Sequence, residues 1–195
     1  RVAPALLNTE KKMKLIMENW KRYLIESIST STQQPAKFTG IIQVVPTDIS
    51  ALEDLQQKIM QKYPDQKPIN KLHLTLLHQK VTSSGGLRGD KALKAFFKSP
   101  ESQNLQPPEI QFGEVGMKTG EGKTSTFIKV LNSDDLKSYL QSVIEGAGLN
   151  PDEIAEASAA EPREAGRIFH VSLTNLTGNP GDSFAHIGGG EAIEV

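Results

Sequence analysis

Two stretches of the chain carry the same short pattern, and this pattern decides the expected fold. Leu72–Leu77 reads "LHLTLL", and Phe169–Thr174 reads "FHVSLT". Each has the order apolar, His, apolar, hydroxyl, Leu, and together they hold two of the four histidines in the 195-residue chain. Alternation of apolar and polar residues predicts a half-buried β-strand in each stretch.

Alternation also sorts the side chains of each strand onto two faces. In the first strand, His73 and Thr75 share the polar face, opposite the leucines. In the second strand, His170, Ser172 and Thr174 share it. Each strand is therefore expected to bury an apolar face and to present an imidazole beside a hydroxyl. If the strands belong to two related halves of one fold, both pairs converge across one groove.

The elements expected around the two motifs follow a similar order. Residues 50–53 have the pattern of a helix capping box, and each His strand follows an expected helix. Strands are expected at 40–46, 71–79, 109–118, 124–131 and 167–176, and helices from 50, from 90 and at 133–146. The acidic residues 150–165 predict a helical turn or an insert, and the glycine-rich residues 177–195 predict no regular structure. This order indicates an α+β layout of two related halves with helices outside the sheets.

Composition indicates an N-terminal segment followed by one globular domain. Residues 10–26 have apolar side chains at helical spacing, so an amphipathic helix and a polar linker are expected over 1–37 and the domain over 38–195. The net charge of −1 gives no basic footprint for duplex nucleic acid. No apolar run approaches the ~18 residues that would span a membrane. The absence of cysteine excludes disulfides and thiolate metal sites.

Two imidazoles beside two hydroxyls suit the cleavage of a phosphodiester. Near neutral pH one imidazole can act as a base while the other acts as an acid. His73 and His170 would form this pair, and Thr75 and Ser172 would donate hydrogen bonds to the phosphate oxygens. Such chemistry needs no cofactor and no metal ion, and the histidines show no metal-ligand spacing of the H-E-x-x-H kind. The sequence leaves open which histidine is the base.

The segments His73–Thr75 ("HLT") and His170–Ser172 ("HVS") resemble the two H-x-[ST] signatures of the 2H phosphoesterase superfamily. The resemblance covers residues 40–177, including the order of the elements. It implies a bilobal fold of two pseudo-symmetric halves, with antiparallel sheets lining a central groove and helices outside. It also implies metal-independent phosphodiesterase activity, with two catalytic histidines and phosphate contacts from Thr75 and Ser172. Substrates in the superfamily include 2′,3′-cyclic phosphates, 2′-5′-linked oligonucleotides and cyclic nucleotides.

Residues 13–26 and 170–187 also resemble segments of tailed-phage proteins. Phage members of the superfamily include the anti-CBASS phosphodiesterases, which open the cyclic di- and trinucleotide signals of an infected cell. This resemblance implies a small cyclic nucleotide or a short oligonucleotide as substrate, and counter-defence in the host-cell cytoplasm. The leader is similar to a capsid-targeting peptide, which implies packaging in the virion.

Two other functions fit the same motifs. One is an RNA-end-processing enzyme that opens 2′,3′-cyclic phosphates, and the other is a non-catalytic nucleotide-binding or virion protein. Turnover separates the enzymes from the binding protein. The remaining histidines are not expected to be catalysts, because His78 falls on the apolar face of its strand and His186 lies in the glycine-rich tail.

Overall fold

A computed structural model of the chain describes residues 36–45, 49–83 and 89–195. The helix expected at 10–26 lies outside these residues. The strands are β1 (Lys37–Phe38), β2 (Ile41–Val44), β3 (Lys67–Pro68), β4 (Leu74–His78), β5 (Phe112–Gly120), β6 (Lys123–Val130), β7 (His170–Asn175) and β8 (Glu191–Ala192). The helices are α2 (Ser50–Lys62), α3 (Gln79–Thr82), α4 (Gly89–Phe96), α5 (Pro100–Asn104), α6 (Ser133–Gly146) and α7 (Pro151–Ala160), with a 3₁₀ turn, η2 (Pro180–Asp182).

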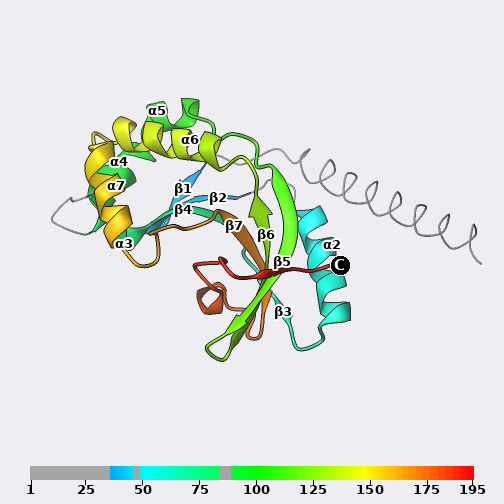
Figure 1. Ribbon diagram of the computed structural model, residues 1–195. Coiled ribbons are helices and arrows are strands. Elements are labelled where there is room, and N and C mark those ends of the chain that lie inside the picture. The colour runs from blue at the N-terminus through cyan, green and yellow to red at the C-terminus, as the bar shows by residue number, and fades with distance from the viewer. Residues whose placement is uncertain (1–35, 46–48, 84–88) are drawn as a thin grey trace, which may run out of the picture.

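The strands of the described part of the chain form one antiparallel sheet (Figure 1). Their order is β1-β2-β4-β7-β6-β5-β8, and the short β3 pairs with β7. The predicted α+β class is therefore confirmed. The order is symmetric about its centre, because β1-β2-β4 on one side corresponds to β5-β6-β7 on the other. A single registered residue pair, Leu74 with Val171, joins β4 to β7 and makes the two groups one sheet.

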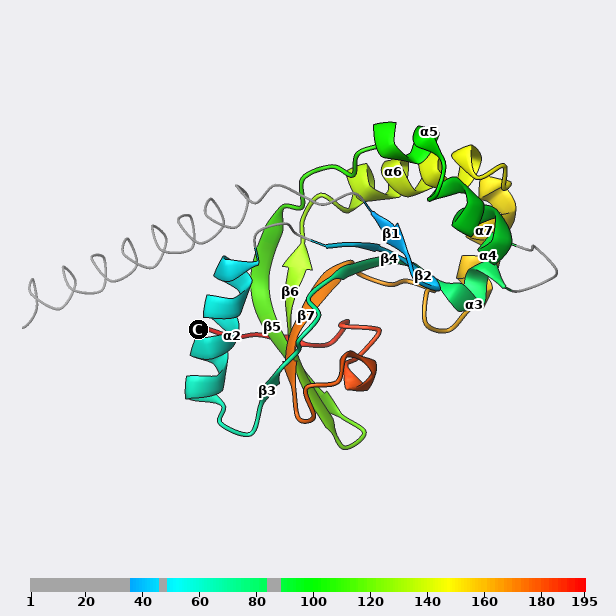
Figure 2. The same ribbon diagram turned by 180° about the vertical axis from the view of Figure 1, so that it is seen from behind.

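The helices exchange sides between the two groups of strands. Helix α2 follows β2 in the chain but packs against β7 and β3, whereas α6 follows β6 but packs against β4. Figures 1 and 2 accordingly show α2 beside β5 and β3, with α3 to α7 gathered at the opposite end of the molecule. Each group of strands thus buries its apolar face under a helix from the other group.

The hairpin expected across residues 109–131 is present as β5 and β6. Its turn is Glu121-Gly122, and both residues have positive φ, 52° and 72°. A two-residue turn with both φ values positive matches the twist of an antiparallel hairpin. Residues 150–165, which are mostly acidic or small, were expected to form a helical turn or an insert. Most of them form helix α7, and a turn at 161–166 follows it.

The prediction that residues 177–195 lack regular structure was wrong in part. Residues Pro180–Asp182 form η2, and Glu191–Ala192 form β8, which pairs with β5. The glycines of this stretch favoured an irregular conformation, but two extended residues are enough to pair with the edge strand β5. The tail therefore folds back across the sheet.

A buried amide fixes α2 to the strands below it. Gln56 is almost fully buried, and its Nε2 donates hydrogen bonds to the carbonyls of Ile69 (3.1 Å) and Leu173 (2.6 Å). The Leu173 carbonyl also accepts the Ile69 amide at 3.0 Å. Buried backbone carbonyls need such donors, because an unpaired polar group in the interior costs free energy.

Replacing Gln56 with Met should lower the free energy of unfolding by about 1–3 kcal/mol, because two buried carbonyls lose a donor. Gln57 is the matched control, since it is the next residue of α2 and is exposed. Gln57→Met should change stability by less than about 0.5 kcal/mol. Urea unfolding followed by circular dichroism measures both, and equal effects of the two substitutions would contradict a structural role for the Gln56 amide.

Candidate active site

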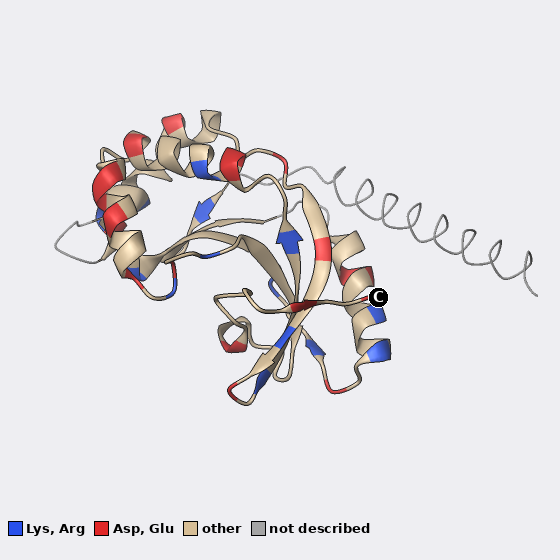
Figure 3. Ribbon diagram, in the orientation of Figure 1, with Lys and Arg blue, Asp and Glu red and all other residues tan. Residues whose placement is uncertain are grey.

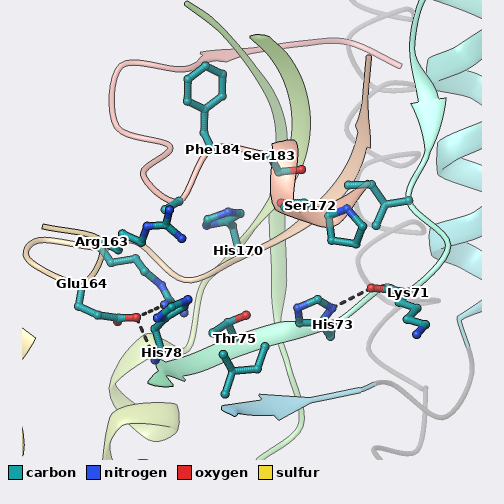
Figure 4. Close-up of a pocket in the computed structure, with 16 residues that line it drawn as sticks. Lys71, His73, Thr75, His78, Arg163, Glu164, His170, Ser172, Ser183 and Phe184 are labelled. Atoms are coloured by element: carbon teal, nitrogen blue, oxygen red, sulfur yellow. Dashed lines mark hydrogen bonds and ion pairs between the residues drawn. The ribbon is translucent and has the colours of Figure 1, made fainter. Parts of the chain in front are cut away.

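One cavity of about 320 Å³ lies against β4 and β7 and contains the residues singled out from the sequence. His73, Thr75, His170 and Ser172 all line it, as Figure 4 shows. The remaining lining residues are Ile41, Ile69, Lys71, His78, Arg163, Glu164, Arg167, Pro180, Gly181, Ser183, Phe184 and Ala185. The two motifs, about a hundred residues apart in the chain, therefore share one site.

The two imidazoles are held in the same way. Nδ1 of His73 bonds the carbonyl of Lys71 at 2.8 Å, and Nδ1 of His170 bonds the carbonyl of Ile168 at 2.8 Å. A carbonyl oxygen can only accept, so Nδ1 carries the proton in both rings. In the neutral form of each ring, Nε2 then carries the lone pair. Each histidine is fixed by the backbone two residues before it, and the backbone of Phe184 also lies against the His170 ring.

Strand pairing sets the neighbours of each imidazole. Leu74 lies opposite Val171 in antiparallel β4 and β7. The residue before one partner is then level with the residue after the other. His73 is therefore beside Ser172, and Thr75 is beside His170. Each imidazole has the hydroxyl residue of the other motif as its cross-strand neighbour.

Both strands carry a β-bulge directly after the hydroxyl residue. In β4, Gln43 pairs with Thr75 but Ile42 pairs with Leu77, so Leu76 is the extra residue. In β7, Phe127 pairs with Ser172 but Thr126 pairs with Thr174, so Leu173 is the extra residue. A bulge reverses the faces of every residue that follows it. The alternation read from the sequence therefore fails after Thr75 and after Ser172.

The first bulge corrects the prediction for His78. Strict alternation puts His78 on the apolar face with Leu74 and Leu76, but beyond the bulge it turns to the face of His73 and Thr75 and lines the cavity. Its Nδ1 accepts the Lys80 amide at 3.2 Å, where it caps α3.

The second bulge corrects the prediction for Thr174. This residue was expected beside His170 and Ser172 but is fully buried on the other face. Its hydroxyl hydrogen-bonds Thr126 at 2.6 Å and Gln66 at 3.0 Å. Asn175 takes the cavity side of the sheet in its place.

Asn175 organises the loop that closes the cavity on the β7 side. Its Nδ2 donates to the Asn179 carbonyl (2.7 Å) and to Ser183 Oγ (3.0 Å), and its Oδ1 accepts the amides of Thr177 and Gly178. Asn175 was not among the site residues expected from the sequence. The available signal was a buried-strand Asn directly before a Gly- and Pro-rich stretch, a common way to order a loop.

A buried ion pair forms the opposite wall of the cavity. Arg167 Nη1 lies 2.7 Å from Glu164 Oε1, and their side chains are only 9% and 6% exposed. The same Glu164 oxygen accepts the His78 amide at 3.0 Å, which ties the 161–166 turn to the end of β4 (Figure 4). Arg167 also lies over the Phe169 ring, 5.6 Å from its centroid. Neither charge was expected in the site, because Glu164 falls in the segment 150–165, expected to be a helical turn or an insert, and Arg167 falls at the start of the strand expected at 167–176.

His170 is partly buried at the wall of the cavity. Its ring packs edge-on against buried Phe127, with ring centroids 5.9 Å apart. Burial lowers the pKa of His170 from 6.5 to about 4, and the Arg167 cation adds to this effect, although the bond to the Ile168 carbonyl opposes it. His170 is therefore a neutral imidazole at neutral pH.

Comparison of the chain with protein-family models, curated proteins and solved structures finds no match. Within residues 36–45, 49–83 and 89–195, no three His, Asp or Glu side chains are grouped so as to hold a metal ion. No helix in the same ranges is long and apolar enough to cross a membrane.

The pKa of His170 gives a prediction about pH. Between pH 6.5 and about 4 the unfolded chain binds a proton at this position and the folded chain does not, so the free energy of unfolding should fall as pH is lowered through this range. NMR of the imidazole carbons and nitrogens, assigned with His170→Gln, should show this residue titrating near pH 4. Titration near pH 6.5 would contradict the buried environment.

The ion pair gives a prediction about stability. Arg167→Met leaves the Glu164 carboxylate buried without its cation and should lower the free energy of unfolding by about 3–5 kcal/mol. Arg163→Met is the matched control, because Arg163 lies in the same turn but is exposed, and it should change stability by less than about 0.5 kcal/mol. Urea unfolding of the two variants makes the comparison, and a small effect of Arg167→Met would show that the pair is not structural.

Proposed function

We propose that this protein is a phosphodiesterase in which His73 and His170 act as the acid–base pair. The observation that carries the proposal is the matched placement of the two rings. Both line one cavity, and both are fixed through Nδ1 to the carbonyl two residues earlier. Histidines that served only to pack the core would not be expected to share the same backbone hydrogen bond and the same cavity.

The environment of His170 supports its assignment as the base. His170 is neutral, so its Nε2 can remove the proton from an attacking hydroxyl or water. The attacking oxygen then forms a bond to phosphorus, and protonated His73 gives its Nε2 proton to the oxygen that leaves. The next step or product release restores both protonation states. Thr75 and Ser172 donate hydrogen bonds to the non-bridging oxygens, where negative charge develops.

The symmetric strand order supports a bilobal 2H phosphoesterase fold. In each half, a strand leads through a helix to the adjacent antiparallel strand that carries the motif, as β2-α2-β4 and as β6-α6-α7-β7. The two motif strands meet at Leu74 and Val171, next to the four site residues. No step of the proposed mechanism is assigned to a metal ion or a cofactor.

The cavity supports a small nucleotide as substrate. Its volume of about 320 Å³ is at the lower end of ligand pockets, which are about 300–1,000 Å³. Phe184 lines the cavity, and the Lys118 ammonium lies over one face of its ring, 5.1 Å from the centroid, so a base would stack on the other face. Acidic and basic residues are mixed over the ribbon, with acidic ones gathered on α7 (Figure 3). We therefore favour a cyclic nucleotide or a short oligonucleotide as substrate. The resemblance of residues 13–26 and 170–187 to tailed-phage proteins adds counter-defence against cyclic-oligonucleotide signalling in the host cytoplasm as its setting.

A second candidate uses the same site. A cavity of this size also accommodates the terminal 2′,3′-cyclic phosphate of an RNA, as RNA-end processing requires. Cyclic dinucleotides and 2′,3′-cyclic mononucleotides as substrates distinguish the two activities.

Substitution of either catalytic histidine should remove turnover. His73→Ala and His170→Ala should each lower kcat by at least about 10³, because proton transfer loses its donor or acceptor. Thr75→Val should lower kcat by about 10²–10³, whereas Thr124→Val, in β6 outside the cavity, should leave it unchanged. Chromatography of products from cyclic di- and trinucleotides, 2′,3′-cyclic monophosphates and a 2′-5′ oligoadenylate, with excess EDTA present, measures these effects.

The same panel decides between the candidates. Product from the cyclic di- or trinucleotides supports the favoured function, and product from the 2′,3′-cyclic monophosphates alone supports RNA-end processing. Binding without product would make the protein a nucleotide-binding protein, and full activity of either His variant would overturn the mechanism.

A further inference from the structure

The cavity wall between the end of β4 and the 161–167 turn is rich in cations. The charged residues of this wall are Arg163, Arg167 and the single carboxylate Glu164. Arg167 and Glu164 neutralise each other in their buried pair at 2.7 Å. The Arg163 side chain forms no hydrogen bond or ion pair with the residues that the structure describes, and only its amide bonds a carboxylate, that of Glu161 at 3.4 Å. One guanidinium at the cavity is therefore unused.

A hydrogen-bond donor lies in the same wall. Nδ1 of His78 accepts the Lys80 amide, so in the neutral ring the proton is on Nε2. Burial lowers the pKa of His78, and the cations Arg163 and Arg167 lower it further, although the Glu161 carboxylate opposes them; the ring is therefore neutral at neutral pH, with Arg163 close to it. A neutral N–H donor beside a guanidinium is suited to a phosphate oxygen.

The position of this wall relative to the proposed acid–base pair is set by β4. Thr75 lies beside His170, and His78 follows it on the same face, beyond the bulge at Leu76. Two to three residues of strand correspond to about 7–10 Å. A single nucleoside can span this separation, so the wall lies where the next phosphate of a nucleotide chain or ring would reach.

We propose that Arg163 and His78 form a second phosphate subsite, which selects substrates carrying a phosphate one nucleoside away from the one that is cleaved. The inference rests on the proposed function, because it takes the His73–His170 pair as the position of the first phosphate. Arg163 contacts the second phosphate through its guanidinium and His78 through Nε2–H. The Glu164–Arg167 pair holds the turn that carries Arg163 against β4. Cyclic dinucleotides and short oligonucleotides meet this requirement, and 2′,3′-cyclic mononucleotides do not.

Binding of two ligands that the proposed chemistry cannot cleave tests the subsite. Adenosine 3′-monophosphate and adenosine 3′,5′-bisphosphate are phosphomonoesters and differ by one phosphate. Isothermal titration calorimetry should show the bisphosphate binding about tenfold more tightly, as expected for hydrogen bonds to a charged group. Arg163→Gln should abolish this difference, and Arg163→Lys should restore part of it. Lys80→Gln removes one positive charge near His78 but outside the cavity, and it should preserve the difference.

The outcomes separate this inference from the function on which it rests. If the monophosphate binds and His73→Ala weakens it, but the bisphosphate gains nothing or keeps its gain in Arg163→Gln, the subsite is wrong and the acid–base site stands. If neither ligand binds, both proposals fail. If the bisphosphate binds through Arg163 while His73→Ala has no effect on either ligand, the subsite exists and the two-histidine site does not. Equal losses in Lys80→Gln and Arg163→Gln would indicate general electrostatics and would also overturn the subsite.

Discussion

The whole site depends on the short antiparallel contact between β4 and β7. Leu74 and Val171 are fully buried and form the only registered pair between these strands in the described part of the chain. Because each lies directly after a histidine, their pairing sets each imidazole beside the hydroxyl residue of the other motif. Through this contact, two motifs that lie about a hundred residues apart in the chain line the same cavity. A register shift of one residue would turn one of the two pairs into the core.

The exchange of helices makes that contact part of the global fold. Helix α2 covers β7 and α6 covers β4, so neither half of the sheet has an apolar cover of its own. Gln56 reinforces the exchange by bonding the carbonyl of Leu173, the bulged residue of β7. The geometry of both motif strands is therefore as stable as the core of the molecule. Thr75, His170 and Ser172 lie in these strands, and His73 directly precedes β4.

Much of this arrangement could be predicted from sequence, and the rest is hidden for physical reasons. Alternation identifies the motif strands and places His73, Thr75, His170 and Ser172 on their polar faces, because a period of two is imposed by the backbone itself. The bulges leave no trace in the alternation, since Leu76 and Leu173 are as apolar as a regular core residue. The faces of His78 and Thr174 were therefore predicted wrongly. The charges of the 161–167 turn were missed because only tertiary contacts bring that turn to β4.

The bulges also show where the two halves stop being equivalent. His78 and Asn175 each lie five residues after the histidine of their motif, and each turns to the cavity side of the sheet. The side-chain amide of Asn175 is hydrogen-bonded to the 176–183 loop. The Nδ1 of His78 is bonded to the Lys80 amide, which leaves Nε2–H for a ligand in the cavity, next to Arg163. The symmetric pair of motif strands thus has two different ends: the loop at 176–183 closes the end at Asn175, and Arg163 gives the end at His78 a positive charge. Because the two ends differ, we expect a ligand with two phosphates to bind in one direction, with its second phosphate toward Arg163. In the proposed mechanism, a fixed direction of binding would allow two chemically identical side chains, His73 and His170, to take different roles.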